Sequence, residues 1–160
     1  MKIQSDLKEF IALMNSNGVE YVVVGGHAVA YHGYPRFTGG LDFFVRPSAE
    51  NAARIILVLR SFGFKDTADL EPVLLEPGKV IQIGRPPNRI DLLTGISGVD
   101  FDQTLATSAA TELDGLPVRI IGFAALLENK NASGRAKDKA DVEQLKKVRR
   151  RRNEGGPQSV

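Results

Sequence analysis

Two short apolar segments, joined by a glycine-rich stretch, constrain the fold of this chain more than any other feature. Residues 21–24 read YVVV, and residues 41–45 read LDFFV. Short runs rich in β-branched and aromatic residues predict buried strands, and Gly25-Gly26 after the first run predicts a sharp end to that strand. A short helix is expected over residues 27–32. The sequence therefore predicts a strand, a tight turn, a short helix and a second strand in succession.

The rest of the chain alternates between predicted helices and predicted strands. Residues 85–88 read RPPN, a strong turn signal, and the apolar segments on either side are expected to pair as an antiparallel hairpin. Because helices separate the other strands, the predicted fold class is α/β (α+β), with a mixed β-sheet flanked by helices. Helices are expected over about residues 6–16, 49–61, 122–130 and 136–152, and strands over residues 80–83, 90–93 and 116–121.

Length and composition limit the classes of protein to which this chain can belong. A chain of 160 residues fits one domain, expected over residues 1–152, with a flexible C-terminal tail over residues 153–160. No apolar run approaches the roughly 20 residues that a membrane-spanning helix needs. The chain has no cysteine, which excludes disulfides, a thiolate metal site and a cysteine nucleophile. Because the N-terminus lacks an apolar signal region, a cytoplasmic location is expected.

Positive charge is concentrated near the C-terminus. Residues 135–152 contain nine Lys or Arg and three Asp or Glu, a net charge of +6. Since the whole chain carries +2, the remaining residues carry −4. Such a segment is either a solvated helix or a surface that binds RNA, DNA or another polyanion through the release of counterions.

Two aspartates lie inside predicted strands. Asp42 lies in the segment LDFFV, and Asp91 lies in the segment IDLL. A carboxylate within an apolar run needs a hydrogen bond, an ion pair or a metal. If the two strands are neighbours, these carboxylates could hold Mg²⁺ against the phosphates of a nucleotide. The alternative is that each aspartate hydrogen-bonds a loop, or pairs with Arg36 or Arg89.

The segment between the first two strands carries groups that could bind phosphate. Gly25 and Gly26 let a phosphate approach backbone N–H groups, although strand–Gly–Gly–helix is also common as plain turn chemistry. His27 comes directly after them and could contact a phosphate or satisfy the turn. Arg36 could contact a phosphate or pair with the aspartate of the second strand, and Thr38 flanks the same loop.

Residues 21–45 resemble the signature of the nucleotidyltransferase (DNA polymerase β-like) superfamily. That signature is an apolar strand, Gly-Gly or Gly-Ser, a spacer, Asp-x-Asp on the next strand, and a third carboxylate on a later strand. The chain supplies VVVGG, the spacer and Asp42, and Asp91 is similar to the third carboxylate. Within the superfamily, the chain is most similar to small bacterial nucleotidyltransferases, some of them toxin–antitoxin components.

The resemblance extends over about residues 20–147. The bacterial proteins share an IDLL strand and a terminal helix of the form K-x-x-x-GR-x-KD-x-x-DVE-x-L, which this chain matches from Lys130 onward. The resemblance places Lys130, Arg135 and Lys137 where the terminal helix faces the nucleotide. The alternative for these three side chains is a solvated charged face.

The resemblance implies a nucleotidyltransferase fold and a chemistry. The reaction would transfer a nucleoside monophosphate from a nucleoside triphosphate to a hydroxyl of RNA or protein and release pyrophosphate. Gly25 and Gly26 would contact the phosphates, Asp42 would bind Mg²⁺, and Asp91 would bind the metal or act as the base. The alternative function is a non-catalytic module that binds nucleotide, RNA or a partner protein in a toxin–antitoxin-type system.

One position departs from the superfamily signature. The first metal-binding aspartate falls at position 40, where this chain has Gly40, two residues before Asp42. Side chains alternate along a strand, so two aspartates at this spacing would share one face. Glycine supplies no ligand, and the resemblance therefore implies an impaired or inactive enzyme. Gly40→Asp is expected to restore the ligand and to raise metal-dependent nucleotidyl transfer.

Overall fold

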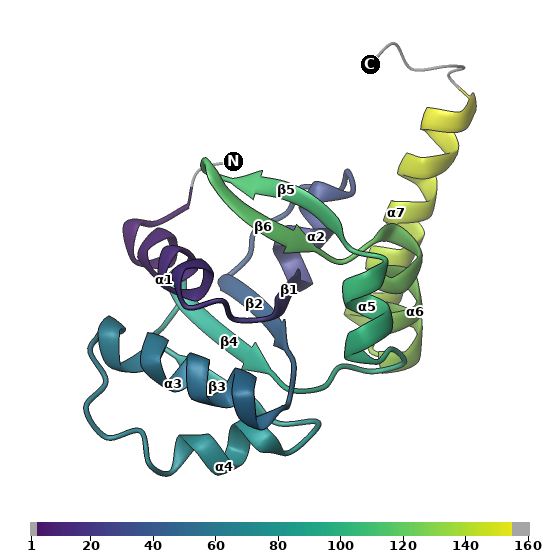
Figure 1. The fold of residues 1–160 in the computed structure, drawn as a ribbon. Helices are drawn as coiled ribbons and strands as arrows, with labels where there is room; N and C mark the ends of the chain where they lie inside the picture. The colour runs from purple at the N-terminus through teal and green to yellow at the C-terminus, as the bar shows by residue number, and fades with distance from the viewer. Residues whose placement is uncertain (1–2, 155–160) are drawn as a thin grey trace.

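Within residues 3–154, the part of the chain that the computed structural model describes, six strands form one sheet in the order β3-β4-β2-β1-β6-β5 (Figure 1). Strand β1 is antiparallel to β2 and parallel to β6, and β2 is parallel to β4. The prediction of a mixed sheet flanked by helices is therefore confirmed. The strands are β1 (Tyr21–Val24), β2 (Gly40–Val45), β3 (Val80–Ile83), β4 (Arg89–Leu93), β5 (Ala109–Leu113) and β6 (Leu116–Ile120).

The helices lie on both sides of this sheet. Figure 1 shows α1, α3 and α4 together on one side and the paired helices α6 and α7 on the other. The helices are α1 (Ser5–Ser16), α2 (Gly25–Tyr31), α3 (Ala49–Phe62), α4 (Leu70–Leu75), α5 (Phe101–Ala106), α6 (Phe123–Ser133) and α7 (Ala136–Glu154). None of the helices in the described part of the chain is long and apolar enough to cross a membrane.

Most of the predicted elements are present, with shifted ends. The predicted hairpin forms, with Val80 of β3 opposite Leu93 of β4. Helix α2 begins at Gly25, two residues earlier than predicted. Helix α7 continues to Glu154, so the first two residues of the predicted flexible tail are helical. The remainder of that tail, residues 155–160, lies outside the described residues.

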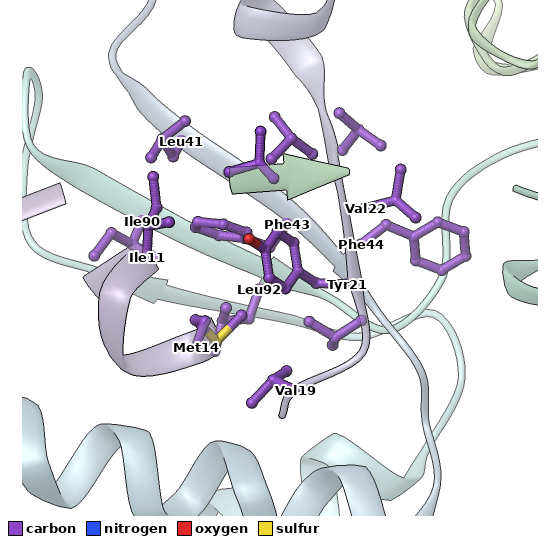
Figure 2. Packing of buried hydrophobic residues seen from close by; sticks show 14 of the residues in the cluster. Ile11, Met14, Val19, Tyr21, Val22, Leu41, Phe43, Phe44, Ile90 and Leu92 are labelled. Atoms are coloured by element: carbon purple, nitrogen blue, oxygen red, sulfur yellow. The ribbon is translucent and has the colours of Figure 1, made fainter. Parts of the chain in front are cut away.

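The core fills both faces of the sheet. Phe43 of β2 packs against Phe10 of α1, with ring centroids 5.7 Å apart, and against Tyr21 of β1 at 5.2 Å. Phe44 packs on the other face against Phe101 of α5, also at 5.2 Å. Figure 2 shows the rings of Phe43 and Phe44 directed to opposite sides of the strand. Because each side chain buried in this way contributes about 1.5–3 kcal/mol, apolar packing fixes the register of β2.

The register of β2 decides where its polar side chain lies. Val24 of β1 is opposite Asp42, one position after the pair of Val23 and Phe43. Asp42 therefore shares the face of Val24, away from the helix α1 side of the core. The carboxylate emerges where β1 ends and α2 begins.

Candidate functional site

The parallel pairing of β2 and β4 brings the two strand aspartates together. Asp42 and Asp91 are register partners, so their side chains lie next to each other on one face of the sheet. The carboxylate of Asp42 also lies directly over Gly25. A Cβ atom added to Gly25 would be 2.0 Å from Asp42 Oδ2, and the φ of Gly25 is +71°. The turn and the carboxylate therefore both require glycine at position 25.

The two carboxylates lie in the wall of a large cavity. Its volume is about 970 Å³, within the range of small-molecule sites. Strand ends, the loop before β2, and the helices α6 and α7 all contribute to it. The polar lining residues include Gly25, Gly26, Arg36, Thr38, Asp42, Gln82, Arg89, Asp91, Asn129, Lys130, Ser133, Arg135, Lys137 and Asp138.

Asp42 holds its proton up to a pH near neutral. Burial raises the pKa of Asp42 to about 7, and the hydrogen bond with Asp91 and the negative charge of Asp91 add to the effect. The cations Arg89 and Lys130 lower the pKa of Asp42 and offset this only in part. Since two adjacent carboxylates repel each other when both are ionised, one proton or one cation is needed between them.

One oxygen of Asp91 has no hydrogen-bond partner. Asp91 is 7% exposed, and its Oδ1 atom is buried. The Nε atom of Arg89 lies 3.3 Å away, but this contact is not aligned as a hydrogen bond. A buried acceptor without a donor costs about 1–3 kcal/mol unless a ligand satisfies it. Asp91 Oδ1 is therefore available to a cation that enters the cavity.

The donor set fits one magnesium ion. Mg²⁺ prefers oxygen ligands and commonly binds to one or two carboxylates together with water and substrate phosphates. Asp42 and Asp91 supply such a pair. Among the described residues, no group of three or more His, Cys, Asp or Glu side chains is gathered for metal binding. A cation held by this pair alone would take its remaining ligands from water or a substrate.

Gly40 does not have room for a side chain. A Cβ atom at this position would lie 1.7 Å from the backbone oxygen of Arg89 and 2.6 Å from its carbonyl carbon. The overlap is with backbone of the neighbouring strand, which cannot swing aside as a flexible side chain would. The expectation that Gly40→Asp simply adds a metal ligand is therefore corrected: the new side chain would have to displace β4 before its carboxylate could reach the cavity.

A buried ion cluster forms the helical wall of the cavity. Lys130 of α6 is 6% exposed, and its Nζ atom lies 3.1 Å from Asp138 Oδ1 and 2.9 Å from Asp141 Oδ2. Arg135 Nε lies 2.8 Å from Asp138 Oδ2, and Arg36 Nη2 lies 3.0 Å from Asp141 Oδ2. Lys130 is thus held by two carboxylates rather than on a solvated face.

The charge of Asp138 in this cluster is fixed by its hydrogen-bond partners. Burial by itself would raise the pKa of Asp138, but hydrogen bonds from Ser133, Arg135 and Lys130 lower it to about 2. Asp138 therefore stays ionised over the physiological range and keeps its attraction for Lys130. The cluster joins α6 to α7 through charge-assisted hydrogen bonds.

The cluster also anchors the loop before β2. Arg36 pairs with Asp141 of α7, and the alternative pairing with Asp42 is not what the structure shows. The Nε atom of Arg36 is buried and has no hydrogen-bond partner among the described groups. Thr38 donates a hydrogen bond from Oγ1 to the carbonyl of Gly40 at 2.9 Å. Arg36 therefore brings an unsatisfied N–H donor to the cavity wall.

His27 is placed differently from the other predicted phosphate contacts. Its side chain is buried, with 7% of the residue exposed, and burial lowers its pKa. Gly25, Gly26, Arg36 and Thr38 line the cavity, whereas His27 is a buried polar residue outside the cavity lining. The structure thus gives His27 a buried position in α2, directly after the glycine pair in the chain.

A comparison with known protein families adds the deciding observation. The family described as nucleotidyl transferase of unknown function (DUF2204) matches residues 3–157, nearly the whole chain. The chain belongs to the DUF2204 family. No curated protein is similar enough to match it. The family description supports a nucleotidyltransferase-type protein and names no donor, acceptor or partner.

In this DUF2204 chain, two residues that the sequence analysis gave no site role, Asp138 and Asp141, lie in or beside the cavity. Both bind Lys130, and the pairing with Arg89 that was the alternative for the strand aspartates is present at Asp91. The spacing of Asp138 and Asp141, three residues apart, puts both on one face of a helix, which was a usable signal. Arg89 and Asp91 are two residues apart on β4, so the alternation of side chains along a strand puts both on one face.

The protonation of Asp42 makes a testable prediction about pH. Its pKa is raised above the unfolded value, so the folded DUF2204 chain binds more protons between pH 4 and 7, and stability falls as pH rises through this range. Asp42→Asn should remove this loss of stability at high pH. A rise in pKa from 3.8 to about 7 corresponds to about 4 kcal/mol at about 1.4 kcal/mol per pKa unit. Because Asp42 is only partly buried, we expect a smaller effect, with the metal-free variant more stable at pH 8 by about 2 kcal/mol.

Thermal unfolding at pH 5 and pH 8, without and with Mg²⁺, measures this effect. The parent chain should gain more from Mg²⁺ at pH 8, where the metal does not compete with the shared proton, and Asp42→Asn should gain little at either pH. Asp66→Asn, at an exposed position outside the cavity wall, is the matched control. A difference between Asp42→Asn and the parent that does not depend on pH would contradict the shared proton.

Proposed function

We propose that this protein binds a nucleoside triphosphate together with one Mg²⁺ and transfers the nucleoside monophosphate to a hydroxyl acceptor. One observation carries the proposal: an unsatisfied buried acceptor, Asp91 Oδ1, and an unsatisfied buried donor, Arg36 Nε, belong to residues that line the same cavity. A cation bound to phosphate oxygens complements both groups at once. The nucleotidyltransferase-type family supports the same reading.

Each residue has a role that follows from its position. Asp42 and Asp91 would hold the metal, which neutralises negative charge on the phosphates when it is bound. Arg36, held in place by Asp141, would direct Nε at a phosphate oxygen. Gly25 and Gly26 contribute backbone but no side chains to the cavity wall. A side chain at Gly25 would collide with Asp42, and one at Gly26 would collide with Thr38.

The second candidate function is nucleotide binding with little or no turnover. The observation that favours it is the pair of carboxylates where the superfamily signature expects three, together with the crowding at Gly40. Phosphoryl transfer depends mostly on positioning and charge neutralisation. A site with one fewer ligand would retain binding more readily than catalysis.

The experiment that separates these functions measures binding and turnover on the same protein. Purified protein would be titrated with each of the four ribonucleoside triphosphates by calorimetry, with Mg²⁺ and with chelator, and pyrophosphate release would be followed with RNA and protein acceptors. The proposal expects Mg²⁺-dependent binding and release, with Asp42→Asn lowering release at least tenfold, about 1.4 kcal/mol. Binding without pyrophosphate would establish the second function, and absence of Mg²⁺-dependent binding would overturn both.

The acceptor that the surface charge favours is RNA. Helix α7 spans 19 residues, about 28 Å at 1.5 Å per residue, and its far end extends beyond the body of the protein (Figure 1). Its first turns line the cavity through Lys137 and Asp138, and its last turns carry exposed Lys and Arg. A strand of RNA whose end reaches the cavity could run along this helix.

Neutralising this end of α7 tests the assignment. Arg150→Gln combined with Arg151→Gln should weaken the binding of a labelled single-stranded RNA and lower its log–log salt slope by about 0.7 for each RNA phosphate that is no longer neutralised. Lys65→Gln, an exposed charge far along the chain, should change the slope much less. An unchanged affinity and slope in the double variant would leave the basic end as a solvated helix.

A further inference from the structure

Phe37 is an aromatic side chain exposed at the wall of the cavity. It is 80% exposed, more than any other large apolar side chain in the described part of the chain, and it lines the cavity between Arg36 and Thr38. An apolar ring held in water contributes nothing to the core. Its position beside the polar groups of the site points to contact with a ligand.

The loop that carries Phe37 is fixed on both sides. On one side, Arg36 is bound to Asp141 at 3.0 Å. On the other side, Thr38 is hydrogen-bonded to Gly40, and it packs so closely on Gly26 that a Cβ there would lie 2.7 Å from Thr38 Cβ. The ring is therefore presented on a backbone that is already ordered, which reduces the entropy lost when a ligand binds.

The neighbours of Phe37 define the chemistry of that ligand. Arg36 offers an unsatisfied N–H donor to an anion, and Asp42 and Asp91 offer oxygens to a cation. A ligand that uses all of these groups has phosphates near the carboxylate pair and a flat ring near Phe37. Nucleotides have this combination, whereas sugar phosphates and inorganic polyphosphate lack the ring.

We propose that Phe37 is the platform on which the nucleotide base stacks. This inference rests on the proposed function and adds the recognition of the base. Stacking uses the face of the base rather than its hydrogen-bonding edge, so it tolerates all bases. The site therefore takes purine and pyrimidine nucleotides with similar contributions from this residue.

Comparing a nucleotide with inorganic triphosphate isolates the stacking contribution. Calorimetric titrations would use ATP, CTP and triphosphate, each with Mg²⁺, on the parent chain and on Phe37→Ala and Phe37→Tyr. Phe37→Ala should weaken ATP and CTP binding by about fivefold to a hundredfold and leave triphosphate binding unchanged. Phe37→Tyr should bind all three within about twofold of the parent, because the ring is kept.

Phe64→Ala is the matched control, since Phe64 is a 38% exposed phenylalanine outside the cavity wall. It should leave every affinity unchanged. Suppose that the parent binds nucleotides. If Phe37→Ala then weakens nucleotide and triphosphate binding equally, or weakens neither of them, the stacking inference is overturned while the proposed function stands. If the parent binds neither ATP, CTP nor triphosphate, both are overturned.

Discussion

Replacing Lys130 with methionine is expected to lower the free energy of unfolding by about 3–5 kcal/mol. The ammonium group is shared between Asp138 and Asp141, and all three side chains are at least nine-tenths buried. Methionine keeps the length of the side chain but leaves two buried carboxylates without their common cation. Arg36 and Arg135 compensate in part, since each contacts only one of them. Urea denaturation followed by circular dichroism measures the loss.

Two further variants test the cause. Lys139→Met changes an exposed lysine on the same helix as the two aspartates and should alter stability by less than about 0.5 kcal/mol. Adding Asp138→Asn and Asp141→Asn to Lys130→Met removes the uncompensated charges and should recover a large part of the loss. Equal destabilisation by Lys130→Met and Lys139→Met would show that the buried cluster does not stabilise the fold.

The main strands could be predicted because short apolar runs of this kind are typical of buried strands. Segments such as YVVV and LDFFV contain too few polar residues to lie at the surface, and both form central strands. Strand β5, residues Ala109–Leu113, was not predicted. It lies at the edge of the sheet, its side chains are mostly half-buried or exposed, and only its pairing with β6 makes it a strand.

Two short helices were also missed, for a related reason. Helices α4 and α5 have six residues each, too short for a recognisable apolar period. Helix α5 is stabilised from outside by the packing of Phe101 on Phe44. Its start did carry a local signal, because Asp100 caps it by accepting a hydrogen bond from the backbone N–H of Gln103 at 2.8 Å.

Some features of the candidate site could be predicted from the local sequence, whereas others depend on residues that are distant in the chain. Asp42 and Asp91 could be found from sequence because a charged residue in an apolar strand needs a partner. The partner of Arg36 could not be found, because Asp141 is 105 residues away in the chain. The obstruction at Gly40 was also hidden, since it depends on the backbone of a neighbouring strand rather than on any side chain.

Gly40→Asp is expected to lower the free energy of unfolding by about 3 kcal/mol and to leave nucleotidyl transfer no higher than in the parent. The added Cβ would lie 1.7 Å from the carbonyl oxygen of Arg89 and 2.9 Å from its backbone nitrogen. To relieve this overlap, β2 and β4 must separate at Gly40, close to the register pair of Asp42 and Asp91. The change that supplies a third carboxylate therefore disturbs the two already present. Denaturation and pyrophosphate release on the same preparation measure both effects.

Alanine variants separate the steric cause from the charge. Gly40→Ala should lose nearly as much stability as Gly40→Asp, because the Cβ atom alone makes the overlap. Gly39→Ala is the matched control: its Cβ would meet only the side chain of Pro86, at 3.3 Å, and should cost less than about 1 kcal/mol. If Gly40→Asp were instead as stable as the parent and transferred nucleotide faster, position 40 would be able to turn its side chain onto the face of Asp42. Strand β2 would then be able to hold the ligand arrangement of the superfamily. The glycine at position 40 would mean only that one carboxylate is missing, and the pairing of β2 with β4 would not require it.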